Sequence, residues 1–233
     1  TGETGQAIEA YETCLTLNPK DEIARHQLNA ISGTTTKEAP LEYISSLFDE
    51  YADRFETILV GDLGYVVPSL LRHEVDKILQ PPKKKFRAAI DLGGGTGLVA
   101  REIRDVATII HNVDISKKMS EVSVKANVYD DVFTNDIVTF LNSEEGLPFY
   151  DLAIAGDTCI YVGDLAPIFS GVYNRLLQGG WFIFNVEQTD EGDFQIQTNG
   201  RYSHSKEYLN KLSNVSGFTT HNIIEIVARK EEN

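Results

Sequence analysis

The stretch that decides the fold is Ala88-Ala89-Ile90-Asp91-Leu92-Gly93-Gly94-Gly95-Thr96-Gly97-Leu98-Val99-Ala100. Its first half is a short apolar run, typical of a buried parallel strand. The four glycines that follow allow the backbone to turn sharply and to approach a bound molecule closely. Leu98, Val99 and Ile103 then begin a helical period, so free N–H groups at a helix N-terminus point toward that molecule. The stretch predicts a nucleotide-type site in an open α/β sheet.

Two cofactors fit the glycine turn. Gly95, Gly97 and Ala100 satisfy the dinucleotide pattern Gly-x-Gly-x-x-Gly/Ala, which permits an NAD-dependent oxidoreductase. Asp91-x-Gly93-x-Gly95-x-Gly97 also resembles motif I of the class I S-adenosylmethionine (SAM)-dependent methyltransferases. A carboxylate at Asp91 would repel a pyrophosphate and attract a cationic ligand, which favours SAM. The resemblance implies that the cofactor contacts Asp91, Gly93, Gly95, Thr96 and Gly97, while a turn without a ligand remains the simplest alternative.

Composition excludes several classes of partner. Acidic residues outnumber basic ones by 35 to 21 and give a net charge of −14, which disfavours nucleic acid as a partner. We find no run of about 18 apolar residues and therefore expect no membrane partner. Cys14 and Cys159 form no motif, which suits a reducing, cytoplasmic compartment, and no Cys/His cluster has metal-ligand spacing. The 233 residues suffice for one substantial core with a small appendage.

After the glycine turn, strand and helix patterns alternate, which predicts a parallel sheet with helices on both faces. The second strand, 108–113, ends at Asp114, where an acidic side chain can accept both ribose hydroxyls of NAD or SAM. Residues 113–119 resemble motif II of the methyltransferases, which implies that Ile115 and Met119 flank the adenine. The third strand, 131–134, leads to Asp136 and Ile137, which match the family position that reads the adenine amino group and packs on the ring. Two acids at successive strand ends favour SAM over NAD.

The acceptor side is predicted beyond the fourth strand, 150–155. In the fold that the resemblance implies, the next loop faces the transferred methyl group, so Asp157 is expected to contact SAM or the acceptor. A helix over 165–177 is expected to stop at Gly179-Gly180 before a fifth strand over 181–186. Residues 200–205 then resemble methyltransferases that carry tetratricopeptide (TPR) repeats. Arg201 could hold an acidic acceptor there, and the base that removes a proton is expected to be His204, Asp157 or Tyr161.

The two ends of the chain carry the remaining expectations. Residues 1–31 are predicted to be a TPR-like helical segment that could dock a protein partner, with a generic helical hairpin as the alternative. Residues 32–40 have linker composition, and 41–233 would be the methyltransferase domain. An amphipathic helix is expected over 41–55, where Tyr51 would cover the cofactor or pack in the core. One more strand is expected over 218–227. The final antiparallel strand of the family has no matching sequence, which suggests a fragment.

The prediction is therefore a class I, Rossmann-like methyltransferase that transfers a methyl group from SAM to a small-molecule acceptor, leaving S-adenosylhomocysteine. No metal is required. An inactive methyltransferase fold that serves as a scaffold and an NAD-dependent oxidoreductase are the alternatives.

Overall fold

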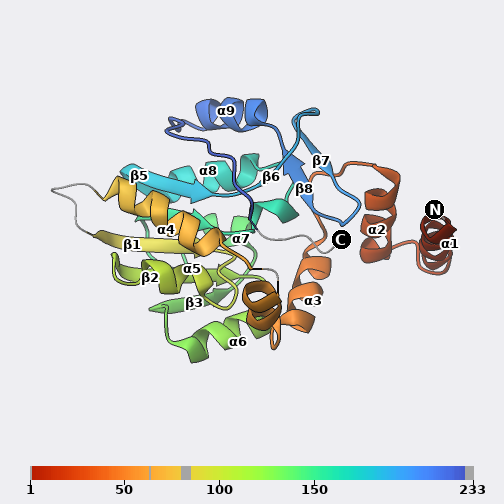
Figure 1. Ribbon diagram of the computed structural model, residues 1–233, viewed down its shortest axis with the longest axis horizontal. Coiled ribbons are helices and arrows are strands. Elements are labelled where there is room, and N and C mark those ends of the chain that lie inside the picture. Colours follow the sequence, from red (N-terminus) through yellow and green to blue (C-terminus); the bar gives the residue numbers. More distant parts are fainter. Residues whose placement is uncertain (1, 63, 80–84, 229–233) are drawn as a thin grey trace.

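A five-stranded parallel sheet forms the centre of the protein, in the order β3-β2-β1-β4-β5 (Figure 1). The computed structural model describes residues 2–62, 64–79 and 85–228. The strands are β1 (Phe86–Leu92), β2 (Ala107–Asp114), β3 (Asp131–Thr134), β4 (Tyr150–Ala155) and β5 (Leu176–Phe184). This order and the parallel pairing confirm the predicted Rossmann-like α/β class.

Parallel pairing brings the carboxyl ends of all five strands to one edge of the sheet. In the register of the central pair, Asp91 on β1 lies opposite Asn112 on β2. Six of the seven β1 residues are buried, as expected for a strand covered on both faces. The third and fourth strands have the predicted bounds, and β2 exceeds its prediction by one residue at each end.

Helices cover both faces of the sheet, as the alternating pattern predicted. One face packs against α4 (Val67–Ile78) and α5 (Leu98–Ile103), whose buried residues include Leu71, Val99 and Ile103. The opposite face packs against α7 (Ile137–Leu141), α8 (Ala166–Arg175) and α9 (Lys206–Val215). The helix α6 (Lys117–Ala126) joins β2 to β3. The segment 159–161 is a single 3-10 turn, η2 (Cys159–Tyr161).

The fifth strand differs from its prediction. Gly179 and Gly180 do not end a helix, because α8 ends at Arg175 and β5 begins at the next residue. Tyr150 pairs with Leu176, whereas Leu152 pairs with Trp181, so β5 accommodates three more residues than β4 between these pairs. Gly179 adopts a φ of +76° in this bulge. A glycine pair therefore bends a strand here, which the helix-stop interpretation did not consider.

The N-terminal helices are α1 (Gly2–Leu17), α2 (Glu22–Ser32) and α3 (Leu41–Tyr51), followed by a π-helical turn, η1 (Thr57–Asp62). Helix α3 ends four residues before the predicted limit of 55. Figure 1 shows α1 at the periphery and α2 beside a small second sheet. That sheet consists of β6 (Glu187–Gln188), β8 (Tyr202–His204) and β7 (Phe194–Ile196), in this order. Ala30, Ala39, Ile196 and Tyr202 form a small core between the two.

Residues 32–40 contact the rest of the protein along much of their length. The Lys37 carbonyl oxygen accepts hydrogen bonds from the backbone N–H groups of Gly163 and Asp164, at 2.8 and 2.7 Å. The hydroxyls of Thr36 and Tyr202 are 2.5 Å apart. The domain boundary at 32–40 and the TPR identity of 1–31 stay predictions, but this stretch is not a freely extended connection.

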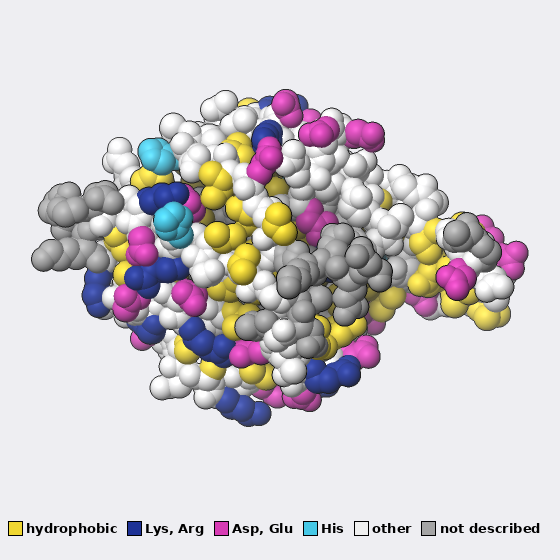
Figure 2. Space-filling view, in the orientation of Figure 1, with side chains coloured by type: hydrophobic (Ala, Val, Ile, Leu, Met, Phe, Trp, Pro, Cys, Tyr) yellow, Lys and Arg dark blue, Asp and Glu magenta, His cyan; other side chains and the backbone are white. Residues whose placement is uncertain are grey.

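The predicted strand over 218–227 is not present. Residues 218–228 lie beyond β5 without regular pairing, and the contacts that connect them to the sheet come from side chains. Phe218 packs on Phe169, and His221 packs on Trp181 with ring centroids 5.2 Å apart. A groove of about 1710 Å³ runs between this segment and β5 and continues to the acceptor side of the sheet. Figure 2 shows apolar side chains gathered on the face that carries α4 and β5.

Candidate functional site

The glycine turn connects β1 to α5 at the carboxyl edge of the sheet. Gly93, Gly95 and Gly97 have φ values of +71°, +54° and +96°, which residues with a Cβ atom rarely adopt. The Gly93 N–H donates to the Val113 carbonyl oxygen at 2.7 Å. The turn is therefore fastened to β2, and its strained backbone explains why glycines occupy these positions.

The glycines have different surroundings. A Cβ atom would lie 2.3 Å from Thr158 Oγ1 at Gly93, and 2.6 Å from Val128 Cγ2 at Gly97. Gly95 has no atom within 4 Å of such a Cβ. Gly93 and Gly97 thus pack against the protein, while Gly95 borders open space. Gly95 is the point of the turn that a ligand can approach most closely.

Asp91 is fully buried at the end of β1. The Tyr129 hydroxyl donates to its Oδ2 atom at 2.8 Å. Its Oδ1 atom is buried and has no hydrogen-bond partner among the residues that the structure describes. Burial raises the pKa of Asp91 to about 7, because desolvation disfavours the charged form. An unpaired carboxylate oxygen at this position suits a ligand that carries a positive charge or a donor.

Asp114, the last residue of β2, holds the turn from the second strand. Its Oδ2 accepts the Gly95 N–H at 2.9 Å, and its Oδ1 accepts the Ser116 N–H at 2.7 Å. Asn112, two residues earlier on the same face of β2, accepts the Gly94 N–H at 3.2 Å. Burial raises the pKa of Asp114 to about 6. Each carboxylate oxygen has a further lone pair, so these bonds leave room for the predicted ribose hydroxyls.

The predicted adenine side lies along α6 and α7. Met119 is fully buried, whereas Ile115 and Ile137 are half-buried. Asp136 follows β3 and caps α7, because its Oδ2 accepts the Thr139 N–H at 2.8 Å. The cap explains an aspartate here without a ligand. The adenine role of Asp136 stays a prediction.

Helix α3 contacts both sides of the carboxyl edge through two successive residues. The Asp49 Oδ1 accepts hydrogen bonds from the Ser116 hydroxyl at 2.6 Å and the Lys118 N–H at 3.1 Å. Phe48 packs edge-on against Tyr161, with centroids 5.2 Å apart. Tyr51, the predicted cover, is 40% exposed and therefore does not serve as core packing.

The acceptor side begins after β4. Asp157 has a φ of +53°, a strained conformation for a residue other than glycine. Its N–H donates to Asn185 Oδ1 at 2.8 Å, and Asn185 Nδ2 donates back to Asp157 Oδ1 at 2.5 Å. This reciprocal pair joins the ends of β4 and β5. Backbone strain that a side-chain pair maintains at a strand end is typical of functional sites.

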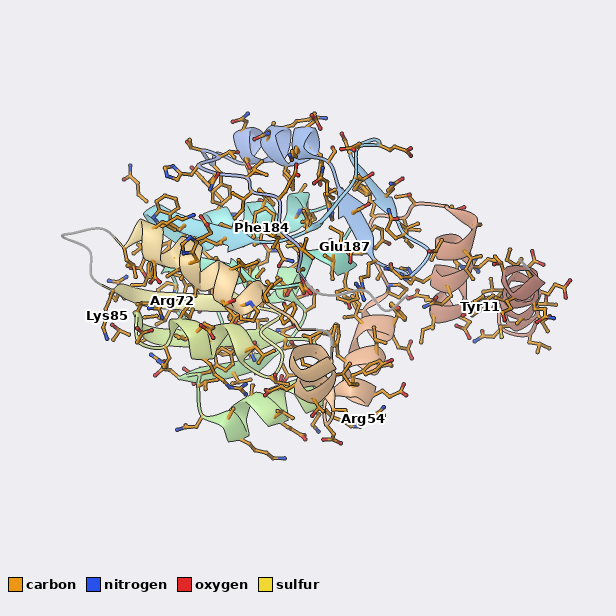
Figure 3. All side chains as sticks on the ribbon, viewed as in Figure 1. Tyr11, Arg54, Arg72, Lys85, Phe184 and Glu187 are labelled. Atoms are coloured by element: carbon orange, nitrogen blue, oxygen red, sulfur yellow. The ribbon has the colours of Figure 1, made fainter. Side chains whose placement is uncertain are left out.

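Arg201 lies in the same region. Burial lowers the pKa of its guanidinium, but the charges of Tyr161, Glu187 and Asp157 outweigh burial and raise it. Its guanidinium forms an ion pair with Glu187 at 2.9 Å, and both side chains are about one-third exposed. Figure 3 shows Glu187 just beyond Phe184, the last residue of β5. An acidic acceptor would therefore have to compete with Glu187 for Arg201.

His204 is buried in β8. Its Nε2 lies 2.9 Å from the Val162 carbonyl oxygen and 3.0 Å from that of Gly163. Since carbonyl oxygens only accept, Nε2 carries the proton, and Nδ1 is the basic nitrogen. Nδ1 is buried and has no hydrogen-bond partner among the described residues. Burial lowers the pKa of His204, so the ring is neutral at pH 7. This geometry favours a structural role over the predicted role as a base.

Sequence reasoning missed several residues of the site: Asp49, Asn112, Tyr129, Asn185 and Glu187. Two of them had a usable signal. Asn112 precedes Asp114 by two residues in an apolar strand, so both point to the same face. Asn185 follows directly on β5, as the other candidates follow their strands. The sequence gives no signal for Tyr129 and Asp49, because only tertiary packing brings these two residues to the site.

Three absences concern the described part of the chain. No group of His, Cys, Asp or Glu residues there is arranged to hold a metal ion. None of the described helices combines the length and apolar character needed to cross a bilayer. Cys14 is exposed and Cys159 is buried, and neither forms a disulfide.

The sheet order, the glycine turn after β1 and the acids at the strand ends define a Rossmann-like α/β protein of the class I methyltransferase type. A family model described as a methyltransferase domain matches residues 65–221. The match covers more than half of the chain, which therefore belongs to this methyltransferase-domain family. A comparison with curated proteins gives no match.

Solved structures resemble the fold. A SAM-dependent methyltransferase from Leishmania major is similar with a TM-score of 0.60 and 17% identity, over 74% of this chain and 72% of that one. A SAM-dependent methyltransferase from Thermotoga maritima, described as a possible histamine N-methyltransferase, has a TM-score of 0.54 and 21% identity over 76% and 82%. Magnesium protoporphyrin IX methyltransferase from Synechocystis, solved with bound SAM, has a TM-score of 0.54 and 14% identity over 76% and 88%. At these identities the likenesses show the fold alone.

Proposed function

We propose that the protein transfers a methyl group from SAM to a small-molecule acceptor. The observation that carries this proposal is the unpaired, buried Oδ1 atom of Asp91 beneath a turn whose Gly95 borders open space. Asp114 adds a second carboxylate at the same turn. The buried Asp91 disfavours a pyrophosphate and favours a cationic cofactor, whereas Asp114 suits the ribose of either cofactor. The residues present therefore fit SAM better than NAD.

The bound cofactor supplies an electrophilic methyl group on a sulfonium. The work of the protein is then to align an acceptor and to exclude water. The polar groups at the ends of β4 and β5 are the proposed acceptor contacts: Asp157, Tyr161, Asn185, Glu187 and Arg201. Where the acceptor must lose a proton, we assign its removal to Asp157 or Tyr161. The Nε2 atom of His204 already donates to two carbonyl oxygens, which supports this choice.

Calorimetric titration of the full chain with SAM, S-adenosylhomocysteine and NAD tests the cofactor assignment. We expect saturable binding of the first two and none of NAD. Binding of NAD alone would overturn the proposal. Incubation with methyl-labelled SAM and a cell extract of small molecules, followed by mass spectrometry, then tests transfer and identifies the acceptor. An enzyme that binds SAM without transferring the label would be the scaffold instead.

A further inference from the structure

Tyr129 lies between α6 and β3, outside both motifs of the predicted cofactor site. Its hydroxyl is 2.8 Å from Asp91 Oδ2 and 3.2 Å from the Gly94 carbonyl oxygen. A Cβ atom at Gly94 would lie 2.4 Å from the same hydroxyl. The phenol therefore fills the space directly under the turn and touches both the carboxylate and the turn backbone.

The charged groups around Asp91 come from three neighbouring elements. Asp114 of β2 repels its negative charge, and the Tyr129 hydrogen bond stabilises that charge. Arg101 of α5 acts on Tyr129 and forms an ion pair with Glu56 at 2.7 Å. Burial raises the pKa of Asp91 to about 7, and the Tyr129 hydroxyl opposes this shift. The carboxyl group is thus close to balance between its two protonation states near neutral pH.

We propose that Tyr129 is a positioning residue of the cofactor site, which keeps the Asp91 carboxylate ionised and aligned toward a positively charged group of the cofactor. The inference rests on the proposed function. A buried carboxylate attracts a cation strongly, whereas its protonated form does not. Loss of the hydroxyl therefore weakens the binding of SAM and also of S-adenosylhomocysteine, because both carry a positively charged α-amino group.

Calorimetry on the full chain compares SAM with S-adenosylhomocysteine for the wild type, Tyr129→Phe and Tyr150→Phe. Tyr150 is the matched control, because it is also a buried tyrosine with a hydrogen-bonded hydroxyl, which lies 2.9 Å from His111 Nδ1. It is the first residue of β4 and therefore lies at the amino ends of the strands, away from the cofactor site. We expect Tyr129→Phe to weaken the binding of both ligands about tenfold, as for one charge-assisted hydrogen bond. Tyr150→Phe should leave both affinities unchanged.

The pH dependence of SAM affinity separates a charge effect from a purely structural one. Wild-type affinity should rise between pH 6 and 8 as Asp91 loses its proton, and the midpoint of this rise should move to higher pH in Tyr129→Phe. The titration of SAM itself is common to all variants, so the difference between variants reports on the protein. In an Asp91→Asn background the Tyr129→Phe substitution should have no further effect on the pH dependence of SAM affinity.

The outcomes are distinguishable. A wild type that does not bind SAM contradicts the proposed function itself. If the wild type binds SAM, an unchanged SAM affinity or an unchanged pH midpoint in Tyr129→Phe overturns the inference. Should Tyr129→Phe not fold, proton release is measured on the wild type and Asp91→Asn in buffers of different ionisation enthalpy. SAM binding near pH 6.5 should release more protons from the wild type, and equal release would overturn the inference.

Discussion

The Nε2 atom of His26 lies 3.0 Å from the carbonyl oxygen of Gly200, although 174 residues separate the two in the chain. The carbonyl can only accept, so the imidazole donates. Gly200 precedes Arg201 in the loop between β7 and β8, and a Cβ atom there would lie 3.2 Å from the Tyr43 hydroxyl. Helix α2 therefore supports the loop that carries a proposed acceptor contact.

Substitution of His26 by Ala should lower the free energy of unfolding by about 1–3 kcal/mol, because it leaves a carbonyl without its donor. SAM affinity should stay unchanged, while turnover falls because Arg201 loses its support. Thermal denaturation, calorimetry and a transfer assay measure the three effects. Glu22→Gln, at an exposed position of the same helix, is the control. If His26→Ala were destabilised but kept its turnover, helix α2 would not support the acceptor site.

Gly95→Ala should abolish most SAM binding with a moderate loss of stability. The added methyl group enters the open space beside the turn, and the positive φ costs about 1–2 kcal/mol. Gly33→Ala is a closely matched control, because Gly33 has a φ of +71° and also faces open space, but caps α2 away from the site. Equal SAM affinities of the two variants would contradict the assignment of Gly95 to the cofactor.

Asp114→Ala should weaken SAM binding by about 1–3 kcal/mol, the usual cost of a lost charge-assisted hydrogen bond. The substitution also removes the acceptor for the Gly95 N–H, so both effects have the same sign. Calorimetry measures the loss, and Asp76→Ala on the exposed side of α4 is the control. Unchanged affinity in Asp114→Ala would remove the ribose assignment.

Arg201→Ala and Glu187→Gln should both lower turnover and leave SAM affinity within about 0.5 kcal/mol, because the pair lies on the acceptor side. His204→Ala should instead lower the free energy of unfolding by about 1–3 kcal/mol, since it leaves two carbonyls without their donor. Transfer assays and denaturation distinguish these patterns. A stable His204→Ala whose turnover falls about 10²–10⁴-fold would restore His204 as the base.

Asp91→Asn should stabilise the protein without cofactor at pH 8 and not at pH 4. The pKa of Asp91 is about 7 in the folded state, against an ordinary value of 3.8. A raised carboxyl pKa contributes stability below pH 3.8, which is lost as the pH rises through 7. The gain at pH 8 should be at most on the order of 4 kcal/mol. Urea denaturation at both pH values measures this gain. A difference in unfolding free energy between wild type and variant that is the same at pH 4 and pH 8 would contradict the prediction.

The local sequence pattern was sufficient to predict the structure of segments whose conformation depends on their own residues. The apolar run before Asp91, the glycines with positive φ and the buried strand over 150–155 follow from residue type and spacing, and the structure confirms them. Alternation of strands and helices likewise determined the parallel sheet, because a parallel pair requires a crossover.

Tertiary structure decided what depends on distant neighbours. Gly179-Gly180 forms a bulge rather than a helix stop because β4 sets the register of β5. Residues 218–228 form no strand and contact the sheet through side chains such as His221, which packs on Trp181. The burial of His204, the pairing of Arg201 with Glu187 and the Tyr129 hydroxyl beneath the turn are contacts between segments far apart in the chain. Residue spacing determines which side chains share a face of one element, but packing between elements determines which of them a ligand can reach.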